Sequence, residues 1–327
     1  MNEGDSFLDG RGTQPMLASS SSHRFALASR DPKAIAATKD AVLSISMLNG
    51  VMLLWFLLTA VAVVFVAVDI RSTPESPVLK WGFILLTVYT GPIGAFLYVL
   101  GCREPLTGLH ERYVAARSRQ VLGSTMHCVA GDGVGILVGA VIASLLTLSR
   151  PLEIGLEYVL GFGFGWTIFQ ALFMRDEAGG SYPRALANTF LPEFLSMNLL
   201  MAGMVPIASL GAIALGRMPG PATPEFWFVM SMALLAGFAA AFPINWWLVA
   251  RGLKHGMMTV RPATVHRTDD PSHATPQPQP VHASTHEGHA GHAKVSPQEI
   301  AWMTVLSVAV FALGMGAVWL LSGHAQM

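Results

Sequence analysis

The chain has 327 residues and no net charge; 52% of its residues are hydrophobic and only 12% are charged. A soluble domain carries about 25% charged residues to wet its surface, so this composition excludes a soluble globular protein and requires lipid to cover the molecule. The absence of net positive charge also argues against nucleic acid as a partner. We therefore expect an integral membrane protein whose main partner is the lipid bilayer.

The order of apolar and polar stretches predicts five segments. Residues 1–40 are rich in Ser, Ala and charge and lack the apolar core and cleavage site of a signal peptide, so we expect a disordered cytosolic tail. Two transmembrane helices follow within residues 41–101. Residues 102–255 are expected to form a four-helix membrane core, residues 256–298 a disordered, His-rich cytosolic loop, and residues 299–327 a last transmembrane helix.

Seven stretches reach the roughly 20 apolar residues that cross a hydrocarbon core. Backbone amides in lipid must be satisfied within each segment, which predicts helices. The stretches lie at 41–68, 80–101, 127–148, 152–174, 186–215, 225–250 and 300–321. The predicted fold class is all-α: a polytopic helical membrane protein with about seven transmembrane helices.

The positively charged residues predict the orientation. When the tails and connections are assigned alternately to the two sides, one side carries 16 Lys and Arg residues and the other carries 4. Cytoplasmic segments carry the excess. We therefore expect the N-terminus inside, the C-terminus outside, and a multi-pass location in a bacterial inner (plasma) membrane.

The third stretch places an acid at the beginning of a membrane span. At about 100° per residue, Cys128, Asp132, Gly135 and Gly139 share one face, and such small-residue stripes let a neighbouring helix approach closely. Asp132 is therefore expected to face protein. His127 points elsewhere, although at the helix end it can still turn toward the bundle. An acid inside a membrane is a functional candidate by default; the alternative is that Asp132 only bonds a neighbouring helix.

The fifth stretch carries a second acid and a row of methionines. Glu193, Met197, Met201 and Met204 share one face of the predicted helix, with Glu193 at about the depth of Asp132. Methionine is a common adaptable core residue, so core packing is the alternative to ligand binding. In the fourth stretch, Glu157 lies nearer the outer side and either begins an outer half-path or only reaches the interface.

Histidines gather after the sixth stretch. Arg251 and Lys254 are expected to anchor this end to lipid headgroups, and His255 follows at the inner surface. Four further histidines recur within a short Gly- and Ala-containing tract: His282, His286, His289 and His292. Such a tract can bind a divalent metal ion, or it can be low-complexity drift in a disordered loop.

Two motifs, "TMHCVAGDGVGI" and "AAFPINWWLVARGLKHGMM", resemble a bacterial membrane protein family catalogued as domain of unknown function 4396. The resemblance covers roughly residues 118–260. It implies a multi-span membrane protein and supplies neither an activity nor catalytic residues.

Two functions follow from these observations. The first is transport or handling of a copper-, zinc- or nickel-like metal ion, with ligands from the residues discussed above: His127, Cys128, Asp132, Glu193, Met197, Met201, Met204, His255, His282, His286, His289 and His292. Imidazole, thiolate and thioether suit soft metals, and imidazole with carboxylate suits zinc or nickel. The alternative is a scaffold or accessory subunit that binds a membrane partner or a second copy. No enzyme is expected, because no nucleophile–base pair is visible, and no cofactor is expected beyond a transition-metal ion.

Overall fold

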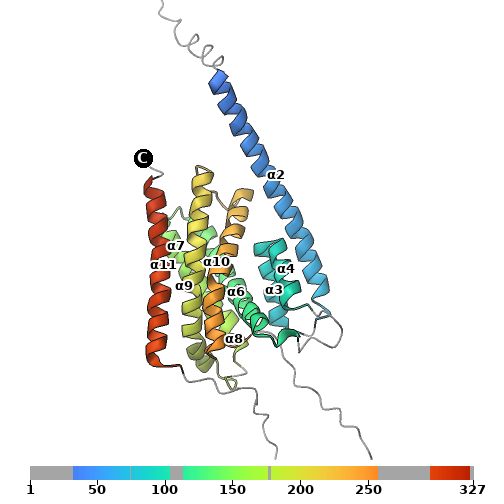
Figure 1. The fold of residues 1–327 in the computed structure, drawn as a ribbon, viewed down its shortest axis with the longest axis vertical. Coiled ribbons are helices and arrows are strands. Elements are labelled where there is room, and N and C mark those ends of the chain that lie inside the picture. Colours follow the sequence, from blue (N-terminus) through green and yellow to red (C-terminus); the bar gives the residue numbers. More distant parts are fainter. Residues whose placement is uncertain (1–31, 74, 104–112, 176–177, 257–294, 325–327) are drawn as a thin grey trace, which may run out of the picture. The chain divides into compact units, whose positions relative to one another are not determined.

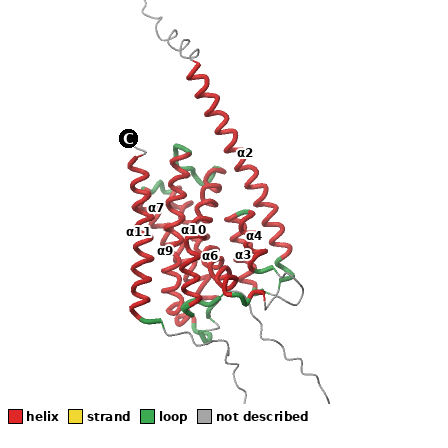
Figure 2. The backbone as a smooth tube through the Cα atoms, viewed as in Figure 1, coloured by secondary structure: helices red, strands yellow, loops and turns green. Residues whose placement is uncertain are grey.

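The computed structural model of the protein describes residues 32–73, 75–103, 113–175, 178–256 and 295–324. These residues form helices and connecting turns, with no strand among them (Figure 2), so the all-α class is confirmed. The main helices are α2 (Pro32–Asp69), α3 (Pro77–Thr90), α4 (Pro92–Gly101), α6 (Arg117–Leu145), α7 (Arg150–Phe164), α9 (Tyr182–Ala214), α10 (Pro224–Ala250) and α11 (Pro297–His324).

Two units are distinguished along the chain, residues 1–53 and residues 54–327. In the first unit, α2 begins at Pro32, so residues 32–40 are helical where a disordered tail was expected. The stretch "PKAIAATKDAV" explains the earlier start, because proline suits the first helical position and alanine favours the interior. The rest of the expected tail, and the His-rich loop between residues 257 and 294, lie outside the described residues.

Six helices of the described chain are long and apolar enough to cross a membrane, and a polytopic membrane protein is thereby supported. They correspond to the expected stretches except the second. Residues 80–101 were expected to cross once, but they belong to the two shorter helices α3 and α4.

Helices α3 and α4 form a hairpin that folds back on itself. Gly91, with φ of 60°, separates the two helices, and the proline that follows cannot continue a helical hydrogen-bond ladder. A Cβ atom at Gly94 would lie 2.6 Å from Cα of Thr87, and the rings of Phe83 and Tyr98 meet edge to face at 5.6 Å. Hence α4 runs antiparallel to α3.

Both ends of the hairpin lie beside the end of α2. The Tyr98 hydroxyl donates to Asp69 at 2.7 Å, and Arg103 pairs with the same carboxylate at 3.0 Å. At the start of α3, the Lys80 ammonium donates to the carbonyl of Arg71 at 3.0 Å. The hairpin formed by α3 and α4 therefore begins and ends beside the same end of α2. Length and apolarity predicted a crossing here because neither property reports a chain reversal.

Glycines allow α6 and α7 to approach closely, as the small-residue stripe predicts. A side chain at Gly135 would collide with the carbonyl of Leu160, and one at Gly139 would lie 2.9 Å from Cα of Glu157. Helix α6 is buried along most of its length. It lies among α3, α7 and α10, while α9 packs between α10 and α11 (Figure 1).

The end of α7 changes its winding. Residues Gly165–Gln170 form a π-helix, η1, which continues into the single turn α8 (Ala171–Phe173). Short π-helical segments interrupt the regular hydrogen-bond ladder and are frequent at functional sites. Here the segment faces α6 and α9.

The hairpin generates a prediction about topology. Seven crossings place Gly10 and Pro278 on the same side of the membrane, whereas six crossings with a hairpin place them on opposite sides. We expect reporter domains inserted at these two positions to report opposite compartments, and a fusion after Gln326 to agree with Gly10. Agreement between the Gly10 and Pro278 reporters would support seven crossings instead of six.

Candidate functional site

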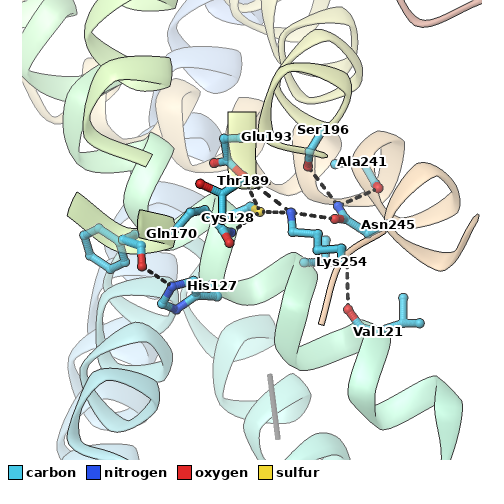
Figure 3. A network of polar contacts seen from close by, with 12 residues as sticks. Val121, His127, Cys128, Gln170, Thr189, Glu193, Ser196, Ala241, Asn245 and Lys254 are labelled. Atoms are coloured by element: carbon cyan, nitrogen blue, oxygen red, sulfur yellow. Dashed lines mark hydrogen bonds and ion pairs between the residues drawn. The ribbon is translucent and has the colours of Figure 1, made fainter. Parts of the chain in front are cut away.

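A cluster of polar side chains is buried near the ends of α9 and α10 that carry Arg184 and Arg251, which we call the basic end of the bundle. Cys128 of α6 lies at the centre (Figure 3). Its thiol donates to Oε2 of Glu193, on α9, at 3.1 Å. The side-chain amide of Gln170, the last residue of η1, donates to the sulfur at 3.0 Å. Three separate helical segments therefore meet at one sulfur atom.

Lys254 brings the positive charge of the cluster. Its ammonium donates to the sulfur of Cys128 and to Oδ1 of Asn245 at 3.0 Å, and it lies 3.4 Å from Oε2 of Glu193. The side chain of Lys254 is only 3% exposed and that of Glu193 is fully buried. The sequence indicated a headgroup anchor at this position, and that interpretation was wrong.

A turn after α10 directs Lys254 inward. Gly252 adopts φ of 68°, a left-handed conformation that glycine enters without steric cost. The amides of Leu253 and Lys254 then donate back to the carbonyl of Leu248, at 2.9 and 3.2 Å, which closes the helix end in the manner of a Schellman motif. The chain therefore reverses at Gly252, and the next long side chain enters the bundle.

The charge on Lys254 is favoured by its neighbours. Burial by itself would lower the pKa of the Lys254 ammonium, but Cys128 and Glu193 outweigh burial and raise that pKa above its ordinary value. Because the folded-state pKa of Lys254 is raised, its charge stabilises the fold fully below the ordinary lysine pKa. That contribution is lost as the pH rises through the folded-state pKa. Lys254 is therefore an ammonium at neutral pH.

Asp132 lies one turn above Cys128 on α6, and its carboxyl meets that of Glu193. A Cβ atom at Gly165 would collide with Oδ1 of Asp132 and would lie 2.6 Å from Oε1 of Glu193. Within the described part of the chain, both oxygens of Asp132 and Oε1 of Glu193 are buried without a hydrogen-bond partner. Buried polar groups almost always have partners, so these three oxygens identify a position for a proton or a cation.

A supporting layer fixes the cluster. Asn245, which holds Lys254, donates to Ser196 at 2.9 Å and to the carbonyl of Ala241 at 3.0 Å. A pocket of about 350 Å³ at the basic end is lined by Gln170, Thr189, Lys254 and others. Gln170 and Lys254 belong both to the cluster and to the wall of this pocket, so the pocket leads to the cluster from the basic end.

The other predicted ligands are distributed as follows. His127 is buried, but its Nε2 donates to the carbonyl of Phe169 at 2.9 Å and its ring packs against Phe169 and Phe173, so it faces away from Cys128. His255 lines the pocket at the basic end. Met197, Met201 and Met204 are fully buried. His282, His286, His289 and His292 lie outside the described residues.

Among the described residues, no group of three or more His, Cys, Asp or Glu side chains is spaced to hold a metal ion. Instead, the Lys254 ammonium contacts both the Cys128 thiol and the Glu193 carboxylate, which also contact each other. The sequence predicted an inner-side site of His127, Cys128, Asp132 and Glu193, and the structure brings the last three together. It did not predict Lys254, Gln170 and Asn245 as members of the cluster. The signal available for Lys254 was Gly252, which predicts a chain reversal two residues before it.

Comparison with protein families finds a match over the part of the chain that carries this cluster. Residues 118–254 match the family model described as "Domain of unknown function (DUF4396)", so the resemblance seen in the sequence is confirmed over these residues. The matched range begins at the start of α6 and ends at Lys254. No curated protein and no solved structure matches the chain.

The close approach of the Asp132 and Glu193 carboxyls to Gly165 generates a prediction about stability. Gly165→Ala should destabilise the protein by about 1–3 kcal/mol, because the added methyl group overpacks the site against both carboxyls. Gly163→Ala, two residues earlier at the end of α7, is the control, because a Cβ atom there meets nothing within 4 Å. Thermal unfolding in detergent should show a lower midpoint for Gly165→Ala alone; equal midpoints would contradict the described position of Asp132.

The ammonium generates a second prediction. Lys254→Met should destabilise the fold by about 3–5 kcal/mol, because it leaves buried acids without their counter-ion. Adding Glu193→Gln should recover much of that loss. Arg251→Met, which breaks a more exposed 2.7 Å ion pair with Glu299, should cost about 1 kcal/mol or less. If Glu193→Gln gives no recovery, the two charges are not coupled.

Proposed function

We propose that the protein exchanges a divalent transition-metal ion for protons across the membrane, with Cys128, Asp132 and Glu193 as the binding groups. The proposal rests on one observation: the cluster buries three acidic groups and one ammonium, and three of its carboxyl oxygens have no partner in the described structure. A buried, uncompensated charge is strongly unfavourable. The acids therefore hold either protons or another cation.

Charge balance gives the stoichiometry. With Lys254 charged and no metal bound, electrical neutrality requires one of the three acidic groups to be ionised and the other two to keep their protons. With a divalent ion bound, neutrality requires all three to be ionised. Binding one divalent ion therefore releases two protons, and the buried cluster is neutral in both states.

The donor atoms support a transition metal over a hard cation. Thiolate sulfur selects zinc and copper, while carboxylate oxygen also suits zinc. In the described arrangement the Lys254 ammonium contacts the sulfur that a metal would bind. As described, Cys128, Asp132 and Glu193 are not spaced to hold a metal ion. Metal entry therefore requires these side chains to rearrange and the ammonium to withdraw from Cys128, and Asn245 already provides an acceptor for it at 3.0 Å. Lys254 would thus supply a positive charge to the site when no metal ion is bound.

The alternative, a scaffold, has support elsewhere in the bundle. Asn198 accepts from the Tyr158 hydroxyl at 2.7 Å and donates to Ser307 at 3.2 Å, so it joins α7, α9 and α11 through neutral, mutually satisfied partners. That is the pattern expected of helix-joining residues. The Asp132–Glu193 pair differs from it, because three of its four carboxyl oxygens are left without partners among the described residues.

A transport measurement tests the proposal. The full chain is reconstituted in vesicles containing a zinc-sensitive or a pH-sensitive dye, and zinc is added outside. We expect zinc uptake accompanied by movement of two protons per zinc ion in the opposite direction. Asp132→Asn and Glu193→Gln should each reduce uptake at least tenfold, because each removes a charged ligand while keeping volume.

The matched control is Glu225→Gln, which removes a carboxylate from an ion pair with Arg217 at 3.5 Å. It should transport at the wild-type rate. If the wild-type protein moves no zinc, or if both site variants transport normally while remaining folded, the exchange proposal fails and the scaffold function stands.

A further inference from the structure

A second acid lies beyond the cluster, on the side of the bundle opposite the basic end. Glu157 of α7 is 4% exposed and lines a cavity of about 180 Å³, together with Ala140, Arg150 and Glu153. Within the described chain no hydrogen bond or ion pair is formed by the Glu157 carboxyl. The nearby Arg150 is already occupied, since it pairs with Glu153 at 2.9 Å and donates to Ser209 at 3.4 Å.

Glu157 and Asp132 lie along the same seam between α6 and α7. Gly161 packs near the carbonyl of Asp132, and Gly139 packs against the backbone of Glu157. The separation of seven positions between residues 132 and 139 corresponds to about 10 Å of helix. The two acids therefore mark two levels of one interface, approximately two helical turns apart.

Apolar side chains occupy the space between these levels. A Cβ atom at Gly161 would lie 2.7 Å from Cγ1 of Ile136 and 2.8 Å from Cε of Met197, and both side chains are fully buried. We call Ile136 and Met197 the apolar plug. Methionine is unbranched and has three rotatable bonds, so one half of the plug can change its shape without moving a helix.

We infer that Glu157 is a second cation site, reached from the side opposite the basic end and separated from the Asp132–Glu193 site by the apolar plug. This inference rests on the proposed function for the identity of the cation. A pocket lined by Gln170 and Lys254 leads to the first site from one side, and the cavity at Glu157 opens the second site to the other. The plug separates the two sides in the described structure, and an ion passes between the sites when Met197 moves aside.

The arrangement also assigns a role to the glycines of the seam. Gly135, Gly139 and Gly161 bring the two helix backbones into contact, which leaves side chains from other positions to fill the path. A larger residue at Gly161 would enter the plug itself. The seam therefore determines how narrow the path is, while Met197 determines whether it is open.

The inference is tested with Glu157→Gln, using zinc as the probe. In detergent, Glu157→Gln should bind zinc at the first site with the wild-type dissociation constant. In vesicles, its zinc transport should fall at least tenfold. Glu225→Gln, whose carboxylate pairs with Arg217 and does not line this cavity, should keep both properties. Wild-type transport by Glu157→Gln would overturn the inference.

A labelling experiment separates this inference from the proposed function. Glu157→Cys, in a background with Cys102→Ser and Cys128→Ser, should react with a membrane-impermeant thiol reagent added from the side opposite the basic end. Native Cys128, in a Cys102→Ser background, should react only from the basic end. If the wild-type protein moves no zinc, the exchange proposal fails but this opposite-sided pattern still supports two half-paths. Reaction of both positions from one side, or no reaction at position 157, would overturn the inference whatever the transport result.

Discussion

The ammonium of Lys254, buried beside a thiol and two carboxyl groups, is the interaction on which the rest of the site depends. A lysine is almost never fully buried without an anionic partner, and its partners here come from helices far apart in the chain. Cys128 belongs to α6 and Glu193 to α9, while Asn245 belongs to α10. The helices must therefore be held in register at this level, or the charge is left without compensation.

Backbone features that look unremarkable in the sequence provide that register. Gly252 reverses the chain so that Lys254 points inward. The π-helix Gly165–Gln170 changes the angular position of its last residue, so that Gln170 reaches the sulfur of Cys128. At its first residue, the absent side chain leaves room for the carboxyls of Asp132 and Glu193. Each feature places one group, and none of them contributes a charge.

The molecule contains two kinds of buried polar group, and the difference between them bears on function. Asn198 and Ser196 have neutral partners and lie in completed hydrogen bonds between helices. Asp132, Glu193 and Glu157 are ionisable. Both oxygens of Asp132 and Oε1 of Glu193 have no partner in the described part of the chain, and Glu157 faces a cavity. Groups of the first kind stabilise the bundle whatever it does. Groups of the second kind reduce its stability unless a proton or a cation visits them, which is why the proposals concern these acids.

The sequence by itself determined the membrane class, the six long helices and the small-residue face of α6, because length, apolarity and helical period are local properties of a chain. It also indicated that Cys128 and Asp132 share the protein-facing side of one helix and that Glu193 lies at about the depth of Asp132, and two of its motifs resemble the family whose model residues 118–254 match. It did not reveal the reversal at Gly91, because an apolar stretch has the same composition whether it crosses or turns back. Only the tertiary structure decided that Lys254 enters the cluster and that His127 turns to a backbone carbonyl instead. Helical period tells which side of a helix is buried, but the partner of a buried group lies on another helix. A long, flexible lysine side chain can reach either the lipid headgroups or the protein interior, and the neighbouring charges decide between them.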